Sequence, residues 1–185
     1  CLIEASGNDP FIVMPSAPLE IAARGAAFAA YLNCGQVCTS AERFYVHDAI
    51  HDEFVALLVA EARKLRLGNG LAEVDMGPMA TMRQRDRFEA LMGNARRQGA
   101  KVATGGGRPA GLNTGWFVEP TVLTEVTPEM DILQNESFGP VAPICRVHSF
   151  DEAIELSNRS DYGLGANLYT RDTDETFRAV REIQS

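Results

Sequence analysis

Cysteine, histidine and tryptophan are scarce in this chain of 185 residues, which contains four, three and one of them. Four cysteines are too few for a disulfide-stapled scaffold, so we expect a reducing, cytoplasmic compartment. The histidines are scattered at positions 47, 51 and 148. None stands at zinc-finger spacing from Cys34 and Cys38, and we therefore expect no metal site.

Basic residues and long apolar runs are also few. Lys and Arg number 17 against 25 Asp and Glu, which gives a net charge of -8 and a pI of about 4.9. An acidic surface repels phosphate backbones, so we expect no nucleic-acid partner. The most apolar stretch, residues 21–32, is interrupted by Arg24 and falls short of the roughly 18 residues of a membrane span. The N-terminus has no basic stretch before an apolar core, so we expect neither a signal peptide nor a membrane partner.

Hydrophobic residues make up 45% of the chain and charged residues 23%, a composition typical of globular proteins. Short β-rich runs alternate with stretches of helical periodicity, which predicts an α/β domain with a largely parallel sheet flanked by helices. The expected strands are 11–14, 43–46, 101–103, 116–126, 141–147 and 164–170. The expected helices are 19–32 with Pro18 in the first turn, 50–65, 88–95, 151–157 capped by Asp151, and a last one capped by Asp172 or Thr173.

Two stretches carry candidate chemistry. Cys38 lies in the segment Asn-Cys-Gly-Gln-Val-Cys-Thr-Ser at residues 33–40, in a loop between a predicted helix and a predicted strand. A cysteine in such a loop acts as a nucleophile when its thiolate is stabilised. The alternatives are a buried apolar cysteine and a disulfide between Cys34 and Cys38. Glu4 follows a candidate strand and would serve as a general base if burial raised its pKa, or would be a solvated carboxylate at a strand end.

Five segments in order resemble the aldehyde dehydrogenase superfamily. The first two are Ile-Glu-Ala-Ser-Gly-Asn at residues 3–8 and Gly-Gln-Val-Cys at 35–38. The others are Gly-Pro at 77–78, Asn-Glu-Ser-Phe-Gly-Pro-Val at 135–141 and Asp-Tyr-Gly-Leu at 161–164. The resemblance extends over essentially the whole chain, with matching spacings.

The resemblance implies a role for each matched residue. Cys38 would attack an aldehyde to give a thiohemiacetal, which loses a hydride to a nicotinamide and becomes a thioester. Glu4 would activate the water that hydrolyses the thioester. Glu136 would bind the nicotinamide ribose and Phe138 would pack near the nicotinamide, with Gln84 and Arg87 in the places of weaker ribose contacts. The cofactor would be NAD or NADP, and the product a carboxylic acid.

The resemblance also implies that residues 1–185 are an incomplete catalytic domain. The family's N-terminal cofactor-binding domain and its C-terminal end would lie outside the chain, which agrees with the absence of Met at position 1. We expect a homo-oligomer in the full-length protein, and little or no dehydrogenase activity from the fragment alone. Two alternatives stay open: a thiol hydrolase in which Cys38 and Glu4 cleave activated esters, and a non-catalytic structural fragment.

Overall fold

The computed structural model describes residue 1 and residues 5–184. Its centre is a six-stranded sheet with the strand order β3-β4-β5-β2-β1-β6. Neighbouring strands are parallel except at one edge, where β3 is antiparallel to β4. The strands are β1 (Asp9–Val13), β2 (Ala41–His47), β3 (Lys101–Thr104), β4 (Thr121–Val126), β5 (Val141–Val147) and β6 (Asn167–Tyr169).

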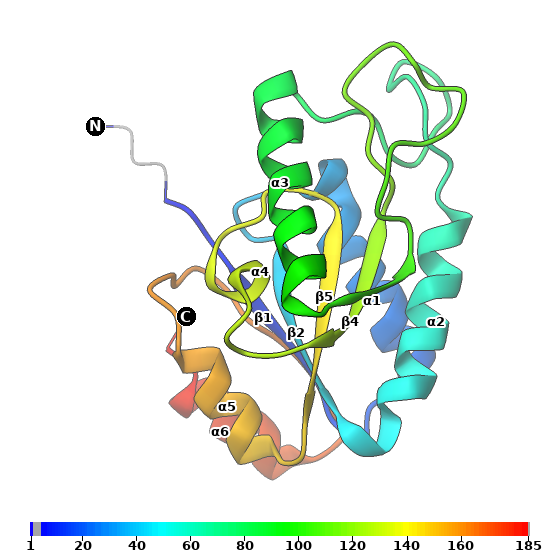
Figure 1. Ribbon diagram of the computed structural model, residues 1–185. Coiled ribbons are helices and arrows are strands. Elements are labelled where there is room, and N and C mark those ends of the chain that lie inside the picture. The colour runs from blue at the N-terminus through cyan, green and yellow to red at the C-terminus, as the bar shows by residue number, and fades with distance from the viewer. Residues whose placement is uncertain (2–4, 185) are drawn as a thin grey trace.

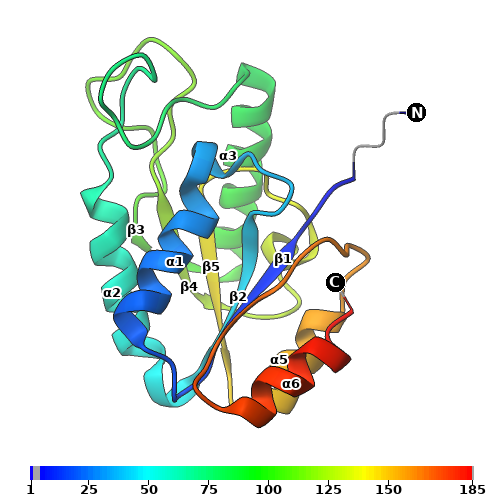
Figure 2. The ribbon, with the colours of Figure 1, turned by 180° about the vertical axis from the view of Figure 1, so that it is seen from behind.

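Helices cover both faces of this sheet (Figures 1 and 2). α1 and α2 lie together on one face, whereas α3, α4 and α5 lie on the opposite face and α6 packs beside α5. The helices are α1 (Leu19–Tyr31), α2 (His51–Lys64), α3 (Met82–Gln98), α4 (Asp131–Gln134), α5 (Phe150–Asn158) and α6 (Thr173–Glu182), with short 3₁₀ turns η1 (Leu32–Gly35) and η2 (Asp48–Ile50). The expected α/β class with a largely parallel sheet is confirmed.

The central strands are buried on both sides, as a parallel sheet between two helical layers requires. Every residue of β1 is buried, and β2 is buried from Ala41 to Val46. The ring of Phe11 in β1 lies 5.0 Å from the rings of both Phe44 in β2 and Tyr169 in β6. Aromatic packing therefore joins three neighbouring strands. None of the helices in the described part of the chain combines the length and hydropathy needed to cross a bilayer.

Several predicted element boundaries are wrong by a few residues, and each error has a local cause. The cap of α5 is Ser149, whose hydroxyl accepts the Glu152 N–H, rather than Asp151. Pro18 is the extended residue before α1 instead of part of its first turn. β4 begins only after Pro120, because proline cannot donate to a strand ladder. β6 is shorter than the predicted run 164–170.

Candidate active site

The candidate site lies at the amino ends of three neighbouring strands. Ser6 precedes β1, Cys38 precedes β2 and Phe138 precedes β5. These strands are adjacent and parallel in the order β5-β2-β1, and Asp9 is paired with Ala41 at their first residues. Parallel neighbours bring their amino ends to the same edge of a sheet, so the topology brings together segments that are far apart in the chain.

A tight left-handed turn separates α1 from the segment that carries Cys38. Asn33, Cys34 and Gly35 all have positive φ, at 51°, 60° and 68°. A Cβ on Gly35 would lie 2.2 Å from the carbonyl oxygen of Gly139, so glycine is required there. Asn33 supports the turn by donating from Nδ2 to the Gln36 carbonyl at 3.0 Å. The turn reverses the chain in a few residues and holds the loop that leads to Cys38 against residues 139–140.

The side chain of Cys38 is exposed, and its backbone is closely packed. A Cβ added to Gly7 would lie 1.8 Å from the Cys38 carbonyl oxygen, so the chain before β1 passes directly against this loop. Gln36 anchors the loop on the other side, because its Oε1 accepts the Ala80 N–H at 3.0 Å. The Cys38 side chain therefore extends from a backbone that is held by Gly7 on one side and by the Gln36–Ala80 hydrogen bond on the other.

The other internal cysteines have a different environment. Cys34 and Cys145 are buried, and all four cysteines are free. Burial raises the pKa of both the Cys34 and the Cys145 thiol to about 12. A thiol with such a pKa carries almost no thiolate at neutral pH. Cys38 is therefore the internal cysteine that is placed to react with a solute.

The segment at residues 136–138 brings Glu136 and Phe138 to the site. The carboxylate of Glu136 accepts the Gly7 N–H through Oε1 at 3.0 Å, which connects this segment to the strand entry at β1. Phe138 is half-buried and has a positive φ of 46°, an unusual conformation for an aromatic residue. Both side chains line the pocket that contains Cys38.

The backbone of this segment is held by side chains from other elements. Tyr162 Oη accepts the Glu136 N–H at 3.4 Å, and Arg87 donates from Nη2 to the Glu136 carbonyl at 3.3 Å. Gln84 donates from Nε2 to the Phe138 carbonyl at 3.2 Å. Gln84 and Arg87 both belong to α3, so this helix contributes two of the side chains that hold the segment.

Glu42 in β2 is a residue that the sequence did not single out. It is 2% exposed, and its carboxylate accepts the N–H groups of Ser137 at 2.6 Å and Phe138 at 2.9 Å. Burial raises its pKa to about 7, while the two backbone hydrogen bonds oppose that rise. Glu42 directly precedes the predicted strand 43–46, and nothing local in the sequence indicated that it is buried.

The pocket has a volume of about 540 Å³ and combines one thiol with polar and aromatic groups. It is lined by Ala5, Ser6, Asn33, Gln36, Val37, Cys38, Arg87, Glu136 and Phe138. Carboxylate oxygens accept hydrogen bonds from sugar hydroxyls, and an aromatic ring packs against a flat heterocycle. This set of groups can accept hydrogen bonds from a hydroxylated ligand and pack against a flat ring beside the Cys38 thiol.

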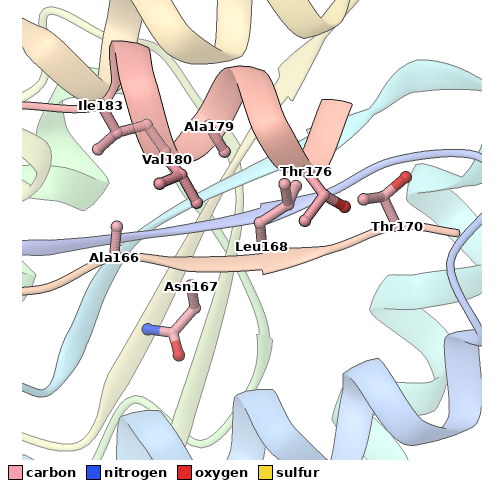
Figure 3. A pocket seen from close by; sticks show the side chains of 8 residues that line it. All are labelled: Ala166, Asn167, Leu168, Thr170, Thr176, Ala179, Val180 and Ile183. Atoms are coloured by element: carbon pink, nitrogen blue, oxygen red, sulfur yellow. The ribbon is translucent and has the colours of Figure 1, made fainter. Parts of the chain in front are cut away.

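A second pocket of similar size lies between β6 and α6 and differs in chemistry (Figure 3). Its volume is about 510 Å³, and its side chains are small or apolar, with two threonines and Asn167. Among the described residues that line it, none has a thiol, a carboxylate or a basic side chain. Of these two pockets, the one with Cys38 therefore holds the thiol and the charged side chains.

Three of the four predicted site residues, Cys38, Glu136 and Phe138, share this pocket. Glu4 lies outside the residues that the structure describes, although the following Ala5 and Ser6 line the pocket. The functional roles of all four remain predictions at this point.

Comparisons with known proteins agree on one family. The model of the aldehyde dehydrogenase family matches residues 1–185. An aldehyde dehydrogenase of Paenarthrobacter nicotinovorans is 44% identical over 185 residues, covering 100% of this chain and 40% of that protein.

Solved structures of the same family superimpose closely. The structure of 3,6-anhydro-L-galactose dehydrogenase in complex with NAP has a TM-score of 0.95 at 42% identity, covering 97% of this chain and 38% of that one. Betaine aldehyde dehydrogenase from Staphylococcus aureus in complex with NAD⁺ has a TM-score of 0.93 at 36% identity, covering 96% and 36%. This chain thus spans about two fifths of the length of these relatives.

Proposed function

This chain belongs to the aldehyde dehydrogenase family, and from that premise we propose that the protein oxidises an aldehyde to a carboxylic acid with NAD⁺ or NADP⁺. Residues 1–185 would form the part that carries the nucleophile. The observation that carries the proposal is the shared pocket, which is lined by the exposed Cys38 together with Glu136 and Phe138.

Cys38 starts the reaction as the nucleophile. Its thiolate sulfur bonds to the aldehyde carbon, and the carbonyl oxygen takes the negative charge of the thiohemiacetal. The backbone N–H of Cys38 donates a hydrogen bond to this oxyanion as the charge develops. The left-handed turn at residues 33–35 supports this step, because it fixes the backbone that carries both the sulfur and the N–H.

Glu136 and Phe138 bind and orient the cofactor. The bound nicotinamide supplies the hydride acceptor that turns the thiohemiacetal into a thioester. Glu136 accepts hydrogen bonds from ribose hydroxyls through its carboxylate, and Phe138 packs beside the ring. Glu4 then takes a proton from the water that attacks the thioester carbon, and the C–S bond to Cys38 breaks to release the acid.

The test is Cys38→Ala in the full-length protein, with Cys145→Ala as the matched control. Loss of the nucleophile should reduce aldehyde-dependent formation of NADH or NADPH by at least about a thousandfold. The control variant should keep its activity to within about threefold, because Cys145 lies in β5 outside the pocket. Wild-type activity in Cys38→Ala would refute the assignment.

A second candidate, hydrolysis of activated esters, is favoured by the exposure of Cys38 in an open pocket. The thiolate would displace a phenolate from an aryl ester, and water would then release the acid from the thioester, with no hydride acceptor involved. Release of nitrophenol from nitrophenyl acetate without dinucleotide, dependent on Cys38, would support it. A rate that is the same in Cys38→Ala would exclude it.

A further inference from the structure

We propose that Glu42 is a positioning residue for the cofactor: it holds residues 136–138 so that Glu136 and Phe138 present their side chains to the dinucleotide. The inference rests on the proposed function and assigns a role to a buried residue outside the pocket lining. Glu42 acts through the backbone of this segment.

The first support is the geometry of the carboxylate. Its two oxygens accept the N–H groups of two consecutive residues, Ser137 at 2.6 Å and Phe138 at 2.9 Å. Two consecutive N–H groups point to one acceptor only when the backbone is folded into a concave turn. The positive φ of Phe138, 46°, is part of this turn. A side chain that occupies both donors therefore stabilises the left-handed conformation that places the phenyl ring.

The second support is the difference in burial among the residues that hold this segment. Gln84 and Tyr162 are half-buried and Arg87 is exposed, so water competes for their hydrogen bonds. Glu42 is 2% exposed, and a buried charge-assisted hydrogen bond exceeds a solvated one in strength. Of these four side chains, Glu42 contributes most to the conformation of residues 136–138.

The third support is the place of Glu42 in the chain. It is the second residue of β2, four positions after Cys38. β2 is a central strand that pairs with both β1 and β5, so its backbone has little freedom to move. Cys38 lies just before this rigid strand, and Glu42 lies within it. The start of β2 therefore fixes the distance between Cys38 and residues 136–138, which Glu42 holds.

The experiment compares Glu42→Gln with Glu73→Gln, an exposed control, in the full-length protein. Glutamine keeps one oxygen acceptor but places an NH₂ group against the second backbone N–H. We expect the Kd and KM for the preferred dinucleotide to rise about tenfold. Amide hydrogen exchange of a peptide covering residues 136–138 should accelerate by a similar factor. Alkylation of Cys38 by iodoacetamide should stay within about twofold of the wild type, and Glu73→Gln should match the wild type throughout.

Unchanged dinucleotide affinity and unchanged exchange at 136–138 would overturn the proposal. An equal change in dinucleotide affinity and in Cys38 alkylation would also overturn it, because that pattern indicates general loosening. If Glu42→Gln does not fold, Glu42→Asp replaces it, since it keeps the charge but is one methylene too short to reach both donors. Wild-type values in Glu42→Asp would then refute the role.

The outcomes for this residue are separable from the proposed activity. Absence of aldehyde oxidation in the wild type would refute the proposed function. Dinucleotide binding and hydrogen exchange require no turnover, and they would still decide whether Glu42 positions residues 136–138.

Discussion

Burial gives side chains of the same type different chemistry at the scale of single residues. Cys38 is exposed in a pocket, whereas Cys34 and Cys145 are buried with raised thiol pKa values. Glu136 lines the pocket, whereas Glu42 is enclosed beneath the same segment and binds backbone N–H groups. Environment thus divides the cysteines and the acidic residues near the site into groups that contact solutes and groups that support the fold.

The environments of the cysteines predict selective alkylation. Iodoacetamide at neutral pH should modify Cys38 at least about 100-fold faster than Cys34 or Cys145, because their raised pKa values and burial suppress both thiolate and access. Peptide mapping by mass spectrometry measures each rate, with the exposed Cys1 as an internal reference. Labelling of Cys34 as fast as Cys38 would contradict the described turn.

The raised pKa of Glu42 predicts a pH dependence of stability. Its pKa is about 7 in the folded protein against 4.5 as the reference value, so folding takes up a proton between these values. The contribution of Glu42 to the free energy of unfolding therefore falls as the pH rises from about 4.5 to about 7, by about 3 kcal/mol.

Denaturant unfolding of the wild type and Glu42→Gln at several pH values checks this sign. The wild type should lose stability relative to the variant between about pH 4.5 and about pH 7, because glutamine does not titrate. A difference that stays constant, or that changes in favour of the wild type, would show that the pKa is not raised.

Cys38 was singled out from the sequence as a candidate nucleophile, whereas Glu42, which lies beneath residues 136–138, was not. Cys38 stands in a short motif with Gly35, and both are local signals. Glu42 accepts hydrogen bonds from the N–H groups of Ser137 and Phe138. These residues lie far along the chain and reach Glu42 only after β2 and β5 have paired. A single sequence shows an acidic residue beside a predicted strand. It does not show the two backbone N–H donors whose hydrogen bonds offset the free-energy cost of burying its carboxylate.

At the scale of elements, short turns with positive φ determine where the pocket walls stand. The turn at residues 33–35 joins α1 to the loop that carries Cys38. Its Gly35 packs against the backbone of Gly139 and Pro140. This contact connects the approach to β2 with the approach to β5. The position of the loop before β2 therefore depends on the position of the loop before β5, because Gly35 packs between them with no room for a side chain.

Gly35→Ala should destabilise the protein by about 3 kcal/mol, since the added methyl group meets a positive φ of 68° and backbone atoms at 2.2 Å and 2.4 Å. Gly77→Ala is the matched control, because its added Cβ has no neighbour within 4 Å and its φ is not in the left-handed range. Thermal and denaturant unfolding measure both variants. Equal effects of the two substitutions would contradict the packing of residues 33–35 on 139–140.

The elements themselves were largely predictable because their signals are local. The apolar run of β5 was predicted as a strand over the same residues, 141–147, and Asp172 caps α6 as expected. The short helix α4 was not predicted, because four residues present too little periodicity to detect. The order of strands in the sheet also needs pairing between distant segments, so the sequence predicted the class of the fold and not its topology.

At the scale of the whole molecule, one buried arginine connects three parts of the fold. Arg43 in β2 is 2% exposed and donates to the carbonyl of Asn8 at 2.6 Å, just before β1. It also donates to the carbonyls of Leu156 at 3.2 Å and Ser157 at 3.0 Å, near the end of α5. The guanidinium thereby joins the strand that leads into the pocket to a helix on the sheet face.

Arg43→Met should therefore destabilise the protein by about 3 kcal/mol or more, since it leaves buried carbonyls without their donor. Arg159→Met provides the control, because Arg159 is 57% exposed in its side chain and pairs with Glu155 on the surface of the same helix end. Surface pairs of this kind contribute about 0–1 kcal/mol. Equilibrium unfolding measures the loss of stability in both variants. A loss in Arg43→Met as small as in Arg159→Met would contradict the role of the Arg43 hydrogen bonds.

The position of β1 between β2 and β6 has a consequence for the newly made chain. Val13 ends β1 and Asn167 begins β6, 154 positions later. A ribosome that adds about 5–20 residues per second takes roughly 8–30 s to cover this distance. Throughout this interval one side of an apolar strand has no neighbour to complete its ladder, and unpaired strands of this kind recruit other chains. The order of the strands therefore leaves this edge of β1 open to pairing with other chains until β6 has been made.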